Sequence, residues 1–154
     1  MNSFIFMAVA LLVCCSGTIE AAAVDACSIC ACSGTEVDCR ARGISSLENF
    51  EFPATATAID LCSNSLSSVP SGAFKSAPKL KNLLLGLNRI EVVASGAFEG
   101  TQVAYVNLQN NELVTLGVDS FRGADKLTLL VLEGNPISYL PQGLFRGLSN
   151  ASKL

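Results

Sequence analysis

The 154-residue sequence contains no histidine. Histidine is the most common general base and a frequent metal ligand, so its absence removes the usual centre of acid–base and metal-assisted catalysis. Phosphate-binding loops and glycine-rich dinucleotide fingerprints are missing as well. We therefore predict a protein without enzymatic activity, cofactor or bound metal.

Clustered positive charge is also lacking. The ten lysines and arginines are scattered along the chain, and with 13 acidic residues they give a formal net charge of −3. A nucleic-acid-binding protein needs a basic patch or stripe, and an anionic membrane surface attracts clustered basic residues. We expect neither nucleic acid nor a membrane surface as a partner.

Only one long apolar run is present, from Phe4 to Cys15. It is roughly a dozen residues long, whereas a membrane-spanning helix needs about 20 apolar residues. Small residues ending in Ala21-Ala22-Ala23 follow it, which is typical of a secretory signal peptide. We predict that residues 1–23 are a signal peptide cleaved near Ala23, and that the product is secreted and extracellular with no membrane span in this chain.

Cysteine, in contrast, is dense at one place. Four of the seven cysteines, Cys27, Cys30, Cys32 and Cys39, lie within thirteen residues, and Cys62 stands alone. An oxidising secretory route favours two disulfides for the cluster. A zinc site would have to accommodate the single residue between Cys30 and Cys32, which is tighter than the usual ligand spacing. A catalytic Cys-x-x-Cys couple normally opens a helix in a βαβ unit, which this sequence does not predict.

From residue 56 onward, one pattern recurs in the segments ATAIDLCSNSL, LKNLLLGLNRI, VAYVNLQNNEL and LTLLVLEGNPI. All four fit L-x-x-L-x-L-x-x-N-x-L, which resembles the leucine-rich repeat template. The units occupy residues 56–79, 80–102, 103–126 and 127–150. Their near-constant period keeps one asparagine of each unit in phase: Asn64, Asn88, Asn111 and Asn135.

Within each unit, the apolar fourth and sixth positions alternate with other residue types, so they lie on one face of a short strand. We expect this face to point into a solenoid, and the parallel strands of successive units to pair at about 4.8 Å. The asparagine follows where the chain leaves the strand, and its buried amide needs hydrogen-bond partners there. We interpret the four asparagines as a structural ladder rather than as binding residues.

The second half of each unit carries a phenylalanine at a fixed place: Phe74, Phe98, Phe121 and Phe145. Rings that recur in every unit predict an aromatic spine within the wider outer part of the coil. Two residues before each ring, we predict a tight turn or a left-handed residue, because glycine and, less readily, aspartate tolerate positive φ. The residues at this place are Gly72, Gly96, Asp119 and Gly143.

Residues 24–55 have too few large apolar residues for a core of their own, so two disulfide staples would make them a cap on the first repeat. CSICACSGTEVDC resembles the N-terminal cap of extracellular leucine-rich repeat proteins, and CSGTEVDC that of the variable lymphocyte receptors of jawless vertebrates. This resemblance implies the pairs Cys27–Cys32 and Cys30–Cys39 and a β-hairpin cap. The predicted fold is an α/β repeat: a curved leucine-rich repeat solenoid with a parallel concave β-sheet, an irregular or 3-10 convex side and a disulfide-stapled cap.

The cysteine-rich C-terminal cap of that receptor family is missing from this sequence. Ala151 and Leu154 would occupy the first and fourth positions of a fifth unit, so residues 151–154 are interpreted as the start of a truncated repeat. An uncapped repeat would expose apolar surface and a strand edge. We therefore expect the chain to be a fragment or a truncated product.

Strand residues that do not point inward should form the open concave face. The third, fifth and seventh positions give Ala58, Asp60 and Cys62; Asn82, Leu84 and Gly86; Tyr105, Asn107 and Gln109; Leu129, Val131 and Glu133. Of these, all except Ala58, Cys62 and Gly86 are our candidate ligand-binding residues. Their apolar centre with polar surroundings resembles the core and rim of a protein interface. An accidental arrangement of solvent-facing residues is the alternative interpretation.

The sequence thus predicts a secreted recognition module that binds a protein or a glycan through its concave face. The resemblance implies an immune-receptor-like role, and a structural protein of the extracellular matrix is the alternative. Cys62 would be a free thiol, either inert or bridged to another chain. Asn150, in the sequence Asn-Ala-Ser, is a candidate glycosylation site.

Overall fold

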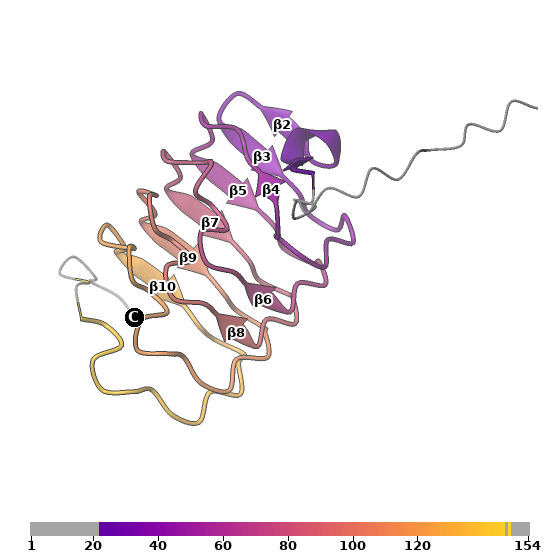
Figure 1. Cartoon of the computed structure of the whole chain (residues 1–154). Coiled ribbons are helices and arrows are strands. Elements are labelled where there is room, and N and C mark those ends of the chain that lie inside the picture. Colours follow the sequence, from indigo (N-terminus) through magenta and orange to yellow (C-terminus); the bar gives the residue numbers. More distant parts are fainter. Residues whose placement is uncertain (1–21, 147, 149–154) are drawn as a thin grey trace, which may run out of the picture.

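The computed structural model describes residues 22–146 and Leu148. Figure 1 shows a stack of coils in which successive coils each contribute one strand to a shared sheet. The sheet has six strands in the order β10-β9-β7-β5-β3-β2. They are β2 (Ala31–Ser33), β3 (Glu36–Asp38), β5 (Ala58–Asp60), β7 (Asn82–Leu84), β9 (Tyr105–Asn107) and β10 (Leu129–Val131). All neighbours pair in parallel except β2 and β3, which pair antiparallel. The predicted solenoid with a parallel sheet is therefore confirmed.

Little regular structure accompanies this sheet. Two short parallel pairs join β1 (Val24–Asp25) with β4 (Phe50–Glu51) and β6 (Ser68–Val69) with β8 (Val92–Val93). A single turn of 3-10 helix, η1 (Ala26–Ser28), belongs to the cap, and the convex side consists of turns. Within the described part of the chain, no helix has the length and apolar character needed to cross a membrane. Most of the predicted signal peptide, Asn150 and residues 151–154 lie outside the described residues.

The cap contains the two disulfides Cys27–Cys32 and Cys30–Cys39, the pairing that the resemblance implied. Its hairpin consists of β2 and β3, and β3 continues the sheet, since Val37 pairs with Ile59 in parallel register. Paired residues of the cap and the first unit are 22 residues apart in sequence. The buried apolar residues of the cap match buried residues of the first unit at this same offset through a whole coil. The matched pairs are Val37 and Ile59, Ile44 and Leu66, Leu47 and Val69, and Phe52 and Phe74. The second half of the cap therefore folds as a degenerate coil.

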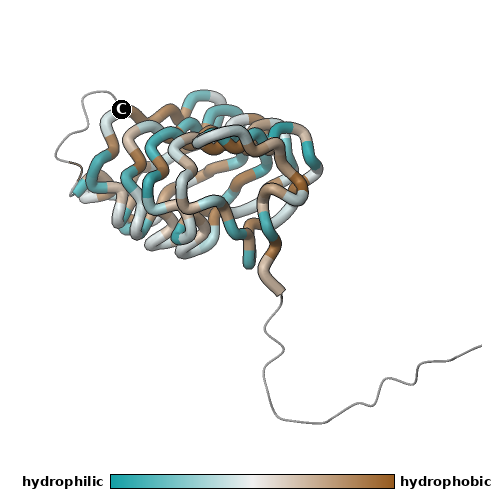
Figure 2. The backbone as a smooth tube through the Cα atoms, turned by 90° about the horizontal axis from the view of Figure 1, so that it is seen from above, coloured by the Kyte–Doolittle hydropathy of each residue, from teal (hydrophilic) through white to brown (hydrophobic). Residues whose placement is uncertain are grey.

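The core lies between the sheet and the convex turns. The inward strand residues Ile59, Leu83, Val106 and Leu130 are all buried. Figure 2 shows hydrophobic segments recurring from coil to coil beside hydrophilic turns. The predicted spine of phenylalanines is confirmed, with ring centroids 6.4 Å, 5.9 Å and 6.5 Å apart along Phe74, Phe98, Phe121 and Phe145. The spine extends into the cap, because Phe52 lies 5.7 Å from Phe74.

The asparagine ladder is also confirmed. The Asn88 amide donates to the carbonyls of Leu85 in its own coil and Leu61 in the preceding coil, each at 3.0 Å. Its oxygen accepts from the backbone N–H of Leu66 at 3.1 Å. Asn111 repeats this pattern one coil later. Each asparagine therefore satisfies buried backbone groups of two coils and joins them.

The position two residues before each phenylalanine follows the prediction in all four coils, since each lies in a turn. Gly72, Gly96 and Gly143 have φ of 65°, 74° and 91°. Asp119 meets the prediction as a residue in a turn, although it is not among the residues with positive φ. The third coil closes the same turn by the hydrogen bond from the Ser120 N–H to the Gly117 oxygen at 3.0 Å. A Cβ disfavours the left-handed region, so the aspartate turn keeps an ordinary φ.

Candidate functional site: the concave sheet

The sheet brings the predicted contact residues together in rows, because parallel pairing places equivalent positions side by side. The first row is Ala58, Asn82, Tyr105 and Leu129, and the second is Asp60, Leu84, Asn107 and Val131. The third row, just beyond the strands, is Cys62, Gly86, Gln109 and Glu133. Residues of the first two rows are partly or fully exposed, while the residues between them are buried. We call these three rows the concave surface; their role in binding stays a prediction.

Sequence reasoning missed the cap's contribution to this surface. Strand β3 places Glu36 beside Ala58 and Asp38 beside Asp60, so both acidic residues extend the rows by one strand. Arg40 lies 22 residues before Cys62, the offset of the paired strands, so it extends the third row by one position toward the cap. The sequence did contain a signal for this extra strand. The segment VDC of the cap lies 22 residues before the similar segment IDL of the first unit, and strands β3 and β5 pair at the same offset.

A charged group forms at this cap end of the surface. Arg40 binds Asp38 with both ends of its guanidinium, Nη2 to Oδ2 at 2.6 Å and Nε to Oδ1 at 3.0 Å, and its Nε lies 3.5 Å from Asp60 Oδ2. The hydrogen bonds from Arg40 lower the pKa of Asp38 to about 2. These side chains are largely exposed, so the pair adds little stability, but it holds the charged groups in fixed positions.

Cys62 lies beside this charged group and is the free cysteine of the described residues. Its backbone N–H donates to Asp60 Oδ1 at 2.9 Å. Burial, and then the neighbouring Asp60 carboxylate, raise the pKa of the Cys62 thiol to about 11. The thiol is therefore protonated at neutral pH and is a poor nucleophile.

The apolar residues of the surface lie toward its other end. Leu84, Tyr105, Leu129 and Val131 come from β7, β9 and β10 and are partly or fully exposed, with Leu129 at 36%. Asn107 separates Leu84 from Val131 in the second row. The concave surface is thus charged over β3 and β5, whereas β7 to β10 combine these four apolar side chains with the polar side chains of Asn82, Asn107, Gln109 and Glu133.

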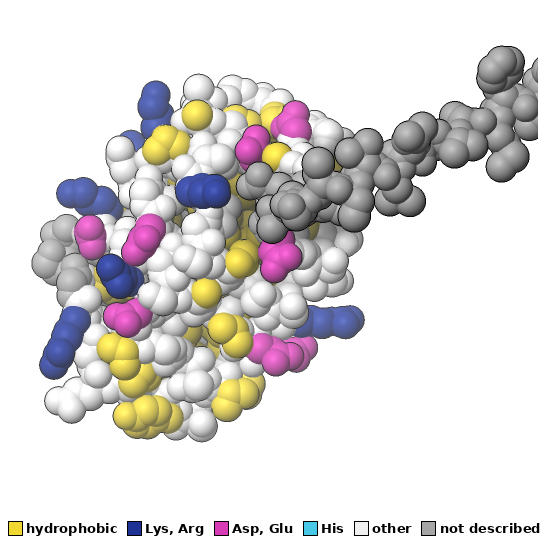
Figure 3. Space-filling model, in the orientation of Figure 1, with side chains coloured by type: hydrophobic (Ala, Val, Ile, Leu, Met, Phe, Trp, Pro, Cys, Tyr) yellow, Lys and Arg dark blue, Asp and Glu magenta, His cyan; other side chains and the backbone are white. Residues whose placement is uncertain are grey.

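A second group of exposed apolar side chains lies on the flank of the coils. Figure 3 shows hydrophobic side chains gathering where Figure 1 draws β8 and the C-terminal coils. The exposed members are Val92, Val114, Val118, Tyr139 and Leu140. None of them belongs to the rows of the concave surface.

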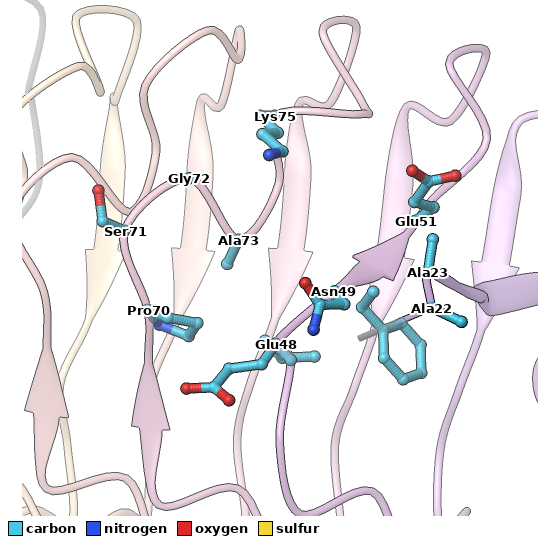
Figure 4. A pocket seen from close by; sticks show the side chains of 12 residues that line it. Ala22, Ala23, Glu48, Asn49, Glu51, Pro70, Ser71, Gly72, Ala73 and Lys75 are labelled. Carbon is cyan, nitrogen blue, oxygen red and sulfur yellow. The ribbon is translucent and has the colours of Figure 1, made fainter. Parts of the chain in front are cut away.

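A hollow of about 670 Å³ lies between the cap and the first coil, also apart from the concave surface. Figure 4 shows its lining from the Glu48–Glu51 segment and from the Pro70–Lys75 turn, with Ala22 and Ala23 at one side. Among residues 22–146 and 148, no group of three or more side chains could hold a metal ion.

Comparison with known proteins gives a consistent result. The leucine rich repeat family model matches residues 55–102 and 101–154. Rat leucine-rich repeat-containing protein 3 is 38% identical over 64 residues, which cover 42% of this chain and 24% of that protein. The platelet glycoprotein Ib beta chain of Papio cynocephalus is 38% identical over 68 residues, covering 43% of this chain and 32% of that protein. The chain therefore spans about a quarter to a third of the length of these relatives.

Two solved structures share the fold. Human 5T4, also described as Wnt-activated inhibitory factor 1 or trophoblast glycoprotein, has a TM-score of 0.62 at 28% identity. That match covers 78% of this chain and 44% of 5T4. The Drosophila Toll–Spätzle complex gives a TM-score of 0.60 at 29% identity, covering 71% of this chain and 15% of that one.

Proposed function

This chain belongs to the leucine-rich repeat family, and from that premise we propose that it is an extracellular recognition module that binds a protein partner through its concave surface. The observation that carries this proposal is the exposed apolar end of that surface, formed by Leu84, Tyr105, Leu129 and Val131. These side chains point away from the core, so folding does not require their apolar character. A protein interface does favour it, because the buried centre of an interface is apolar and its rim is polar.

The rigidity of the sheet supports recognition. Strands β5, β7 and β9 each pair with a neighbour on both sides, so their outward side chains are held at fixed spacing. A surface that is ordered before binding loses little conformational entropy when a partner docks. The Toll chain, a structural neighbour, is described in complex with Spätzle, which supports a protein as the class of partner.

The disulfides of the cap support an extracellular location, since such bonds persist in oxidising compartments. Secretion after removal of residues 1–23 is part of the proposal. So is an immune-receptor-like role, which rests on the resemblance of the cap to lymphocyte receptors. Incorporation of the chain into an insoluble matrix, rather than binding of a soluble partner, would favour the structural alternative.

The test is a screen of the secreted chain against purified extracellular proteins, followed by biolayer interferometry on each hit. Tyr105→Ala should weaken binding by about fivefold or more, because truncating a buried aromatic anchor at an interface typically costs over 1 kcal/mol. Val92→Ala is the matched control, since it removes an exposed apolar side chain on the flank. Unchanged affinity of Tyr105→Ala, or an equal loss in both variants, would remove the concave surface as the binding site.

A further inference from the structure

Backbone contacts with the rest of the fold begin at Val24. Ala22 and Ala23 are exposed and make no hydrogen bond with any other described residue. The Val24 N–H donates to the Asn49 oxygen at 2.7 Å, and β1 then pairs in parallel with β4. Ala26, two residues further on, is fully buried. The folded part of the chain therefore starts directly after Ala23.

Two exposed carboxylates lie beside this starting point without a positive partner. Parallel register places Asp25 next to Glu51, and we call these two residues the acidic pair. None of the ion pairs found among the described residues includes either of them. Like charges on neighbouring strands repel each other, so a positive charge at this place would favour the pairing of β1 with β4.

The hollow between the cap and the first coil connects the acidic pair with the start of the fold. Glu51, Glu48, Ala22 and Ala23 all line it. Figure 4 shows the Glu51 side chain close to Ala23, whereas the Glu48 carboxylate points away from both. Ala23 is bonded to the Val24 nitrogen, so removal of Ala23 would leave that nitrogen beside Glu51.

Two cuts near this point suit a signal peptide, and the structure distinguishes them. A signal-peptide cut follows small residues in an A-x-A-like arrangement, which Ala21 and Ala23 provide. Ala26 is the next small residue along the chain, but a cut after it would remove β1 and its pairing with β4. A cut after Ala23 leaves every hydrogen bond found in the described fold in place.

We propose that the leader is cut at the Ala23–Val24 bond and that the freed α-ammonium of Val24 becomes the counter-ion of the acidic pair. Hydrolysis consumes one water: Ala23 leaves with a carboxylate, and the Val24 nitrogen takes up a proton at neutral pH. That nitrogen then carries three hydrogens, of which one keeps the bond to the Asn49 oxygen and two can face the carboxylates. The hollow is thus the seat of the mature amino terminus. This inference rests on the secretion that is part of the proposed function.

The experiment uses the full chain secreted by cultured eukaryotic cells, which remove the leader themselves. Mass spectrometry of the N-terminal peptide identifies the first residue of the mature chain. The α-amino group is then acetylated with N-acetoxysuccinimide at pH 7 in 0.15 M NaCl, and the rate is followed on the same peptide. Only the unprotonated amine reacts, so an ion pair that holds the proton slows the reaction.

The variants are Glu51→Gln and, as the matched control, Glu48→Gln. Both remove one carboxylate of similar shape from the same segment and from the lining of the hollow, but only Glu51 lies beside the proposed ammonium. Neither residue belongs to the concave surface.

We expect the mature chain to begin at Val24. Glu51→Gln should be acetylated about twofold to fivefold faster than the native chain, which is the range for loss of an exposed ion pair. Glu48→Gln should change the rate by less than about 1.5-fold, since salt at this concentration screens charges that are not in contact. In 1 M NaCl the acceleration in Glu51→Gln should disappear, which a change in local packing would not explain.

The possible contrary results affect different parts of the argument. A mature chain that begins at another residue, Cys27 in particular, would overturn the inference. An unchanged rate in Glu51→Gln, an equal acceleration in both variants, or an acceleration that persists in 1 M NaCl would remove the counter-ion role. All these results leave binding through the concave surface intact. A chain that is not secreted would count against the proposed function itself.

Discussion

Replacing Asn88 with alanine should destabilise the solenoid strongly, because this buried side chain serves backbone groups of two coils. The substitution leaves the Leu66 N–H, buried in the core, without its partner at 3.1 Å. An orphaned buried donor costs about 1–3 kcal/mol. The carbonyls of Leu61 and Leu85 each lose one hydrogen bond but keep another from the asparagine of an adjacent coil or of their own. At about 0.5–1 kcal/mol for each of these two losses, the expected total is about 2–5 kcal/mol.

Urea unfolding followed by circular dichroism, at 25 °C and without reductant, measures this loss. The control is Asn82→Ala in the same coil, since Asn82 is exposed and its side chain makes no hydrogen bond found in the described structure. It should change the unfolding free energy by less than about 0.5 kcal/mol. Equal effects of the two substitutions, or a loss below about 1 kcal/mol for Asn88→Ala, would refute the reasoning that the ladder joins the coils.

Two further predictions concern backbone geometry and the thiol. Gly123→Ala should cost about 2–5 kcal/mol in the same urea assay, because Gly123 has φ of 86° and an added Cβ would lie 2.8 Å from the backbone of the preceding coil. Gly34 also has positive φ, at 60°, but open space around it, so Gly34→Ala should lower the unfolding free energy by less. Equal losses for the two substitutions would contradict the close approach of the backbone at Gly123. Cys62, whose pKa of about 11 lies above the ordinary 9.0, should react with iodoacetamide at pH 8 about 100-fold more slowly than an unperturbed thiol, and should accelerate up to about pH 11. Rapid alkylation at pH 8 would contradict the raised pKa of this half-buried thiol.

The sequence predicted the solenoid because every unit must bury the same few positions. A path that makes one turn per unit places the apolar strand residues, the asparagine and the phenylalanine of each unit on the inside together. Because of that constraint, the asparagine ladder and the phenylalanine spine could be predicted from the spacing of these residues along the sequence. It also predicted which strand residues face outward, since strand side chains alternate between two faces.

The degenerate coil of the cap escaped prediction because its marker residues are replaced. Cys39 stands where the first unit has Leu61, and Arg42 where it has Asn64, so the template does not match. The positive φ of Ser63 and Leu87 escaped prediction for a different reason. Ser63 and Leu87 carry no local signal for positive φ, because the hydrogen bonds between neighbouring coils impose that geometry.

The nearly constant offset between paired strands has a consequence for how such a molecule changes over evolutionary time. Each coil contacts its neighbours through equivalent strand, asparagine and phenylalanine positions. A duplication or deletion of one whole unit, such as residues 80–102, therefore leaves equivalent residues facing each other on both sides. The binding face can then be lengthened or shortened in steps of a single strand. The cap already has most of the inward-facing residues of a repeat unit. A few substitutions could therefore convert its second half into a repeat, or a repeat into part of the cap.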